Sequence, residues 1–557
     1  MSDFYNTLLQ ELIMKQRAGQ NVEDEIKKIK HRILQFQEHI MEGVKTRSRT
    51  KTTTEEERAS LYQIATEKNR GQKKYISSLT TIDNRRITSC KDILHKEELY
   101  YTRLFGYKPS DEKEQVTVLE HITTCIPEEE INLLTNPISL DEISQAIKTS
   151  RKHSAPGPDG IDYSFYKQYW DIIKQEMHRL MNELLCTTDS PMGFNEGIII
   201  LIPKKMTPTI MKDFRPITLL NADCKLFSKI IANRIRPYLS SLLGNEQKCG
   251  VPGRSIIENL VGIRDTIIQL TSGNKEKAAL LSLDFQGAFD NMHHQYMFQI
   301  MRRMKIPNLI INAINFLYTE AHSRVQINGY FTHPIKLQSA VRQGCPLSML
   351  LYTLCSEPLI RMLQAHLIRY IPQDNLFSTI TYADDIVIRL RHPNQMADLQ
   401  RILRSYELAS TAKINLQKST LLLLRNWPVD RSFAEMPIKY QVKILGMIIH
   451  ADMQKMLELN WTPLLTYIRY TLAQHKYRNL NLFQKVWHIN LLVLSKLCYL
   501  SQVLPLPVEI SQRIELSINY YLWSGHLYKI AKTQLWKPIE EGGLGLYCVQ
   551  KNARPCS

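Results

Sequence analysis

The sequence has no Cys-x-x-Cys pair and no compact group of cysteine and histidine residues. This absence argues against a structural zinc site, which gathers about four such ligands at close spacing. We therefore expect the ten scattered cysteines to be reduced and mostly buried thiols of an intracellular protein.

Long apolar runs are missing as well. The most apolar long stretch, residues 486–500, is interrupted by His488, Asn490 and Lys496, so we do not expect it to span a membrane. The first residues lack the basic and then apolar pattern of a secretion signal. No membrane partner is therefore expected.

Positive charge is in excess. The 557 residues include 71 Lys and Arg against 54 Asp and Glu, a formal net charge of +17. Such a balance suits a partner covered in phosphates. A basic protein without such a partner stays open, because net charge alone does not identify a nucleic-acid binder.

Two acidic elements lie far apart in the chain. Residues 382–385, Tyr-Ala-Asp-Asp, stand between the apolar stretches 376–381 and 386–390, which predicts a β-hairpin with two carboxylates at its tip. Upstream, the apolar run 280–283 ends at Asp284 and predicts a buried strand. An isolated Asp-Asp pair at a turn usually only faces water. If the strand lies beside the hairpin, however, Asp284 and Asp384 can bind the same Mg²⁺ ions, and two such ions support phosphoryl transfer.

The chain contains Asp284-x-x-x-Ala288-Phe289-Asp290, followed by Tyr382-Ala383-Asp384-Asp385. This pair of motifs resembles the catalytic core of reverse transcriptases. Flanking segments narrow the resemblance to LINE-type, non-LTR retrotransposon proteins; they are residues 156–160 (Pro-Gly-Pro-Asp-Gly), 247–260, 341–348, 443–446 and 542–546. Where relatives usually have proline after the serine of 341–348, this chain has Met349.

The resemblance implies an α+β right-hand polymerase with fingers, a palm built on an antiparallel sheet, and a helical thumb. We expect a basic helical N-terminal extension over 1–135, fingers and palm over 136–450, the thumb over 451–530, and a post-thumb segment over 531–557. Residues from Tyr547 onward no longer match. The N-terminal endonuclease and the C-terminal zinc knuckle of such proteins are not found, so we expect a segment of a longer protein or a truncated copy.

The resemblance also implies RNA-directed DNA polymerisation: addition of dNTPs to a primer 3'-hydroxyl with two Mg²⁺ ions, Mn²⁺ being possible. The implied catalytic and metal-binding residues are Asp284, Asp384 and Asp385, with the Phe285 carbonyl as a further metal ligand. The implied nucleotide-binding residues are Lys204, Arg215, Phe289, Gln343 and Lys413. The implied primer or template residues are Gly253, Arg254, Arg342, Gly344 and Gly446.

Three of these residues have specific expected roles. Phe289 would exclude a 2'-hydroxyl sterically, Gln343 would lie near the sugar, and Lys413 would protonate the leaving pyrophosphate. Spacing alone leaves simpler interpretations open. Lys204 and Arg215 can be ordinary surface charges, and Phe289 can be a core residue.

An apolar stripe near the start predicts a helix, because its members recur at steps of four and three; they are Val22, Ile26, Ile29, Ile33, Phe36 and Ile40. Fewer than three full heptads favour docking on the chain itself over self-association. The following basic residues predict either a solvated face or contacts to template RNA; they are Arg47, Arg49, Lys51, Lys68, Arg70, Lys73, Lys74, Arg85 and Arg86.

The expected partners are an RNA template, a DNA primer or target, and dNTPs; the oligomeric state is not predicted. The implied location is the nucleus and cytoplasm, with the nucleus needed for integration. Two other interpretations stay open. One is a polymerase of the group II intron maturase type, and the other is a non-catalytic RNA-binding protein derived from a retroelement.

Overall fold

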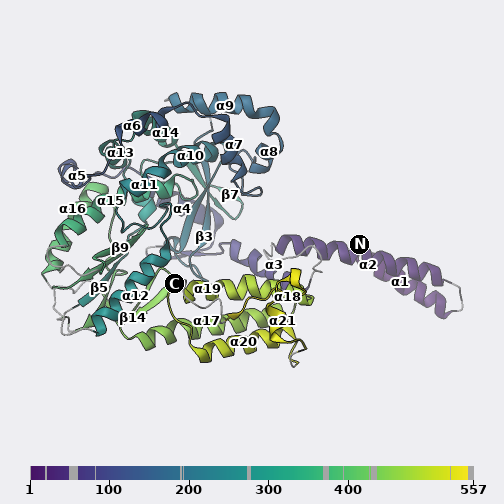
Figure 1. Cartoon of the computed structure of the whole chain (residues 1–557). Coiled ribbons are helices and arrows are strands. Elements are labelled where there is room, and N and C mark those ends of the chain that lie inside the picture. Colours follow the sequence, from purple (N-terminus) through teal and green to yellow (C-terminus); the bar gives the residue numbers. More distant parts are fainter. Residues whose placement is uncertain are drawn as a thin grey trace. The chain divides into compact units, whose positions relative to one another are not determined.

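The computed structural model (Figure 1) divides the chain into two compact units, residues 76–456 and residues 1–75 together with 457–557. The described residues are 2–18, 20, 22–48, 60–81, 83–187, 191, 193–272, 278–367, 376–392, 394–425, 427, 436–526 and 529–549. The larger unit is α+β and the described part of the smaller unit is helical. Residues 76–135, which we expected in a separate N-terminal extension, belong to the larger unit.

The larger unit is built on a sheet that we call the central sheet, with the strand order β12-β11-β5-β10-β9. Its strands are β5 (Ala278–Leu283), β9 (Thr379–Tyr382), β10 (Asp385–Leu390), β11 (Thr420–Arg425) and β12 (Ile438–Lys439). Neighbouring strands are antiparallel except β11 and β12, which are parallel. The expected antiparallel sheet is therefore mixed.

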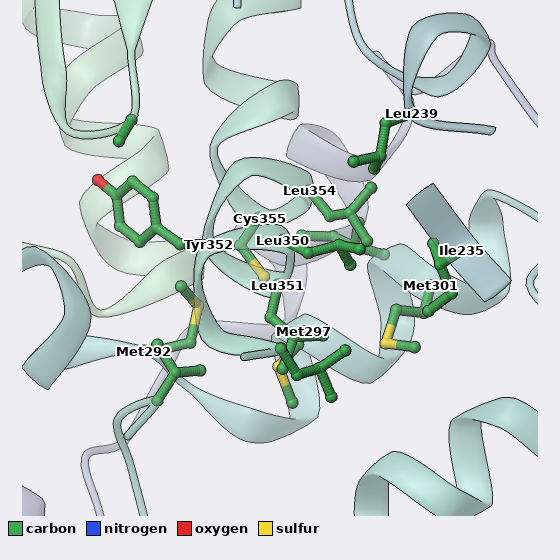
Figure 2. Close-up of a cluster of buried hydrophobic side chains, with 14 of the residues drawn as sticks. Ile235, Leu239, Met292, Met297, Met301, Leu350, Leu351, Tyr352, Leu354 and Cys355 are labelled. Carbon is green, nitrogen blue, oxygen red and sulfur yellow. The ribbon is translucent and has the colours of Figure 1, made fainter. Parts of the chain in front are cut away.

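One face of the central sheet contributes to the main apolar core. Ile386, Ile388 and Leu390 of β10 are alternate residues, so they point to the same face, and all three belong to this core. Figure 2 shows a part of the core in which methionines 292, 297 and 301 gather with leucines 350, 351 and 354. Tyr352 lies at the side of this cluster. Helix α12 (Ile256–Ser272) also contacts the central sheet, at β9 and β11.

A second sheet has the order β4-β3-β6-β7, with β8 also paired to β6. Its strands are β3 (Glu196–Pro203), β4 (Phe214–Leu220), β6 (His322–Ile327), β7 (Tyr330–Phe331) and β8 (Ile335–Lys336). The apolar run 197–203 forms most of β3. Asn328 and Gly329 form the turn between β6 and β7, with φ values of 51° and 93°, as a two-residue type I′ turn requires.

Short pairs and helices complete the larger unit. The two-stranded pairs are β1 (Leu79–Thr80) with β2 (Arg86–Ile87) and β13 (Gln441–Ile444) with β14 (Met447–His450). The other helices are α4 (Cys90–Phe105), α5 (Glu112–Leu119), α6 (Glu128–Thr135), α7 (Leu140–Lys148), α8 (Tyr163–Gln168), α9 (Trp170–Cys186), α10 (Ala222–Ile235), α11 (Leu239–Leu242), α13 (His294–Arg303), α14 (Asn308–Tyr318), α15 (Ser348–Leu367) and α16 (Gln395–Ser410). Ser139 and Glu142 form a reciprocal capping box at the start of α7.

The smaller unit consists of helices from both ends of the chain. They are α1 (Ser2–Arg17), α2 (Glu23–Ser48), α3 (Leu61–Lys74), α17 (Met453–His475), α18 (Leu482–His488), the π-helical turn η6 (Ile489–Leu494), α19 (Ser495–Ser501), α20 (Val508–Leu522) and α21 (Lys532–Trp536). The predicted N-terminal helix is confirmed as α2, and Ile26 and Ile29 pack with Leu12 of α1. Of the basic series, Lys68 is exposed on α3, whereas Arg49 and Lys51 lie outside the described residues.

The cysteines are less buried than we expected. All nine cysteines in the described ranges are free, but only Cys224, Cys249 and Cys355 are buried, while Cys125 and Cys186 are exposed. Cys125 lies in the loop after α5, and Cys186 is the last residue of α9. Among the described residues, no helix has the length and apolar character needed to cross a membrane.

Candidate active site

The central sheet brings the three predicted carboxylates to one end. Leu283 of β5 pairs with Ile386 of β10, so the next residues towards that end, Asp284 and Asp385, adjoin each other across the two strands. Asp385 in turn pairs with Tyr382 of β9, which leaves Ala383 and Asp384 as the turn of the hairpin. Distant parts of the sequence therefore meet at one sheet end.

The like charges at this end repel one another. Burial, followed by the charge of Asp284, raises the pKa of the half-buried Asp384, while the Arg215 guanidinium favours its ionised form. Asp385 is an exposed residue, yet reduced hydration of its carboxyl group and repulsion from Asp384 and then Asp284 raise its pKa to about 6. The cluster thus has an excess of negative charge that a cation would relieve.

Gln247 supports the hairpin tip. This buried side chain accepts the Ala383 N–H through Oε1 at 3.1 Å and the Cys249 N–H at 3.0 Å. The backbone around it pairs with β9, because the Thr381 N–H donates to the Glu246 carbonyl and the Lys248 N–H donates to the Thr381 carbonyl. Ala383 has a φ of 55°, a left-handed conformation that residues other than glycine rarely adopt.

The backbone at Asp284 is held on its other side. Its N–H donates to Ser419 Oγ at 3.0 Å, and its carbonyl accepts the Asn415 N–H at 2.8 Å. The Gln286 N–H donates to the Lys413 carbonyl, so Phe285 stands between two bonds of this antiparallel bridge. Since residues alternate in the direction of their backbone groups, the Phe285 carbonyl points towards the β10 side, where the hairpin lies.

These oxygen donors suit a hard divalent cation. Three carboxylates and a backbone carbonyl are the ligand types that Mg²⁺ prefers. In the described ranges, no three Asp, Glu, His or Cys side chains are arranged so that they could hold a metal ion by themselves. Incomplete coordination by protein is usual for Mg²⁺, which keeps waters and binds substrate phosphate oxygens. The residues present therefore fit this ion when a phosphate ligand is also bound.

Phe289 and Gln343 lie close to this end from two further segments. Phe289, in the turn η3 (Ala288–Asn291), is half-buried and stacks on Tyr352 with 4.7 Å between ring centroids. The charges of Asp384 and Asp385 act on the buried Tyr352 hydroxyl. Gln343 Nε2 donates to Asp290 Oδ1 at 2.9 Å, so the amide of Gln343 has a fixed orientation beside the turn.

Lys204 and Arg215, two of the predicted nucleotide-binding residues, lie at the paired ends of β3 and β4. Arg215 pairs with Ile202, and Lys204 directly follows β3. Both side chains are exposed, and each acts electrostatically on the site, Arg215 on Asp384 and Lys204 on Asp290. Lys413 is also exposed and acts on Lys108. These positions keep the positive charges accessible.

Of the predicted primer or template residues, two glycines stand at open turns. Gly253 has a φ of 78° with open space where a side chain would lie. Gly446 and Leu445 have φ values of 88° and 47° and connect β13 to β14.

The other three predicted primer or template residues have internal partners. Arg254 donates to the carbonyls of Ser240, Leu243, Gly244 and Gln247. Arg342 is buried and donates to the carbonyls of Asn195 and Leu317. A β-carbon at Gly344 would lie 2.5 Å from the Thr218 carbonyl oxygen. The structure thus uses these three residues for packing around the site.

Sequence reasoning missed several supporting residues. Asp290 lies within the quoted Asp284 motif but had no assigned role. Gln247 lies in the quoted segment 247–260 and Ser419 lies six residues after Lys413, but no pattern marks the hydrogen bonds of either side chain. Lys108 had no signal at all, although its ammonium donates to the Asp290 carbonyl and to Asn291 Oδ1. Their functions depend on contacts between segments remote in sequence.

Comparison with known proteins identifies part of this chain. Residues 202–449 match the family described as reverse transcriptase (RNA-dependent DNA polymerase). The Transposon TX1 uncharacterized 149 kDa protein of Xenopus laevis is 28% identical over 517 residues, which cover 91% of this chain and 39% of that protein. The Pol polyprotein from the type-1 retrotransposable element R2 of Nasonia vitripennis is 27% identical over 46% of this chain and 24% of its own length.

A third relative is the RNA-directed DNA polymerase from mobile element jockey of Drosophila melanogaster, 24% identical over 60% of this chain and 37% of that protein. The chain thus spans well under half the length of each of these relatives. All three carboxylates lie within the matched region. Residues 202–449 are therefore a reverse transcriptase domain, and the chain that contains it is similar to proteins of transposons and non-LTR retrotransposable elements.

Proposed function

We propose that this chain is an RNA-directed DNA polymerase of a non-LTR retrotransposon, which extends a DNA primer on an RNA template. The observation that carries the proposal is the meeting of Asp284 with Asp384 and Asp385 at one sheet end of the reverse transcriptase domain. Electrostatic repulsion among the three side chains is consistent with a site completed by cations.

Asp284 and Asp384 would hold two Mg²⁺ or Mn²⁺ ions, with support from Asp385 and the Phe285 carbonyl. Bound there, the ions supply activation of the attacking primer 3'-hydroxyl and neutralisation of charge on the transferred phosphate. Gln247 and Ser419 keep the backbone of the two acidic segments in place. Their hydrogen bonds set the geometry before substrate arrives.

The surrounding side chains would bind the nucleotide. The Lys204 ammonium and the forked Arg215 guanidinium suit the triphosphate, and Lys413 would protonate the pyrophosphate. Gln343, oriented by Asp290, would contact the sugar. The Phe289 ring would occupy the space that a ribonucleotide 2'-hydroxyl needs.

The proposal includes a right-hand arrangement of the whole enzyme. The central sheet would be the palm, the second sheet part of the fingers, and the helices from α17 to α20 the thumb. RNA template, DNA primer or target and dNTPs would be the partners, in the nucleus and cytoplasm. Gly253 and Gly446, both exposed at turns, are predicted primer or template residues.

The proposal is tested by replacing one carboxylate. The full chain is assayed for incorporation of labelled dTTP on poly(rA)/oligo(dT), with and without Mg²⁺. Asp384→Asn should reduce extension by at least on the order of 10²-fold, because a charged ligand opposite the reacting phosphate is lost. Asp92→Asn, at an exposed position of α4, is the matched control and should extend normally. Normal incorporation by the Asp384 variant would end the proposal.

A further inference from the structure

A segment outside the matched domain reaches the turn that carries Phe289. Residues 104–111, here called the strap, connect the end of α4 to the start of α5. Lys108 belongs to the strap. Its ammonium donates to the Leu104 carbonyl, also in the strap, at 2.7 Å and to Asn291 Oδ1, outside the strap, at 2.6 Å. A longer contact, 3.3 Å, joins it to the Asp290 carbonyl. One side chain thus ties the strap to the residues that directly follow Phe289.

The turn itself is too short to be stable alone. The single turn η3 spans four residues and follows Gly287, whose φ is 57°. An isolated turn of helix gains little from its own hydrogen bonds, because fixing its first residues costs more than one bond returns. Its internal bond runs from the Asp290 N–H to the Gly287 carbonyl, and the Phe289 carbonyl accepts the Val341 N–H. External contacts such as those of Lys108 must therefore determine its conformation.

The strap also contacts the segment that leads to Gln343. The Phe105 carbonyl accepts the N–H groups of Gln338 and Ser339 at 2.9 and 3.0 Å. Ser339 Oγ donates to the Gly106 carbonyl at 3.1 Å. Residues 338–339 lead directly into the segment that carries Gln343. The strap therefore connects the Phe289 turn and the Gln343 segment.

The surroundings of the Lys108 side chain disfavour its charged form. Lys108 is half-buried, and this burial lowers its pKa to about 8, although Asp290 favours the charged form; Lys413 opposes it. Hydrogen bonds from a charged group are stronger than neutral ones. Among the described residues, this half-buried charge donates hydrogen bonds to the strap and to the turn and to no other segment, which fits a bracing role.

We propose that Lys108 is a positioning residue that fixes the turn carrying Phe289 and so sets how strongly the polymerase rejects ribonucleotides. The inference rests on the proposed function and on the sugar-excluding role of Phe289. Without the ammonium, the turn gains freedom and the ring no longer blocks the 2'-hydroxyl consistently.

The test compares Lys108→Met with the wild-type chain and with Lys96→Met, which removes an exposed lysine of α4. The ratio of kcat/KM for dTTP to that for UTP is measured on poly(rA)/oligo(dT). In parallel, hydrogen exchange is measured in peptides that cover residues 287–292. In Lys108→Met the ratio should fall roughly tenfold, equivalent to about 1.4 kcal/mol, and these peptides should exchange faster. Lys96→Met should match the wild type in both.

The outcomes separate the two proposals. Wild-type chain that incorporates no dTTP overturns the proposed polymerase, and the exchange measurement then still decides whether Lys108 braces the turn. With an active wild type, an unchanged ratio, or an equal loss for dTTP and UTP, overturns the role in sugar selection. Unchanged exchange at 287–292 in Lys108→Met overturns the brace in either case.

Discussion

At the scale of single residues, the tip of the β9–β10 hairpin depends on the buried side-chain amide of Gln247. Gln247 Oε1 accepts two backbone N–H groups, one of them from Ala383, whose φ is 55°. Left-handed backbone at a residue with a side chain persists only when its surroundings fix it. The position of Asp384, the next residue, therefore depends on a side chain more than 130 positions upstream.

Replacing Gln247 by Met should remove this acceptor with little change in side-chain volume. The N–H groups of Ala383 and Cys249 would lose their partner in a buried place, which costs about 1 to 3 kcal/mol per group. We expect a lower urea midpoint and a decrease in kcat that exceeds any change in KM for dTTP. Urea denaturation and steady-state primer extension measure the two effects.

Gln168→Met serves as the comparison for that variant, because Gln168 is exposed at the end of α8. It should retain both the stability and the kcat of the wild type. A Gln247→Met chain with wild-type kcat would show that the tip keeps its geometry without this hydrogen bond, and the supporting role would be withdrawn.

Residue chemistry alone could not separate functional from structural arginines. Arg215 and Arg342 carry the same guanidinium and both are predicted site residues, yet Arg215 is exposed and acts on Asp384, whereas Arg342 is buried against backbone carbonyls. Sequence spacing does not report which carbonyls a fold leaves without partners. Burial of a guanidinium with such partners is a property of the folded chain.

At the scale of elements, prediction succeeded where the determinants are local. The hairpin over β9 and β10, the buried strand β5 and the helix α2 follow from apolar runs and from the spacing of apolar residues. The parallel pairing of β12 and the contact of α4 with the second sheet depend on distant partners. Those features, and with them the strap, could not be read from local patterns.

Helix α4 carries a buried carboxyl group within its packed face. Glu97 is fully buried, and neither of its side-chain oxygens has a hydrogen-bond partner in the described structure. Burial raises its pKa to about 8. The same helix packs Ile93, Tyr101 and Phe105 into an apolar cluster with the second sheet, so an ionised Glu97 would oppose the packing that holds the strap.

The stability of the chain should therefore fall as pH rises. The folded state keeps a proton on Glu97 up to about pH 8, whereas the unfolded chain loses it near 4.5. Between these values the folded state binds more protons, so the free energy of unfolding decreases with pH. Glu97→Gln should remove much of this decrease and stabilise the protein at pH 8 by up to about 4 kcal/mol. Urea denaturation at pH 5 and pH 8 measures it.

Glu98→Gln, the next residue of α4, is a control of opposite sign. Burial favours the neutral form of Glu98, but its hydrogen bonds and charge interaction with His333 together outweigh burial and lower its pKa. Its contribution to stability is therefore lost as pH falls and not as it rises. This variant should retain the loss of stability between pH 5 and pH 8. An equal loss in the wild type and in Glu97→Gln would rule out Glu97 as its cause.

The whole molecule combines a strongly positive chain with a small group of negative charges at its proposed centre. The net charge of +17 favours the binding of nucleic acid to the protein surface in general. Asp284, Asp384 and Asp385, in contrast, would repel a phosphate unless cations are present. Binding and catalysis should therefore be separable. Binding depends on the many lysines and arginines, and catalysis on three carboxylates with their ions.

Binding of a primed RNA template should weaken steeply with salt, because each neutralised phosphate releases counterions. A protein that neutralises about six to ten phosphates loses on the order of 10³ to 10⁵ in affinity between about 50 and 200 mM salt. We expect a loss in this range, measured by fluorescence anisotropy, and the same salt slope for Asp384→Asn. A slope corresponding to only one or two phosphates would contradict an extended nucleic-acid interface. Steep binding by a wild-type chain that extends no primer would instead favour the non-catalytic RNA-binding protein, because charge would then account for all of its activity.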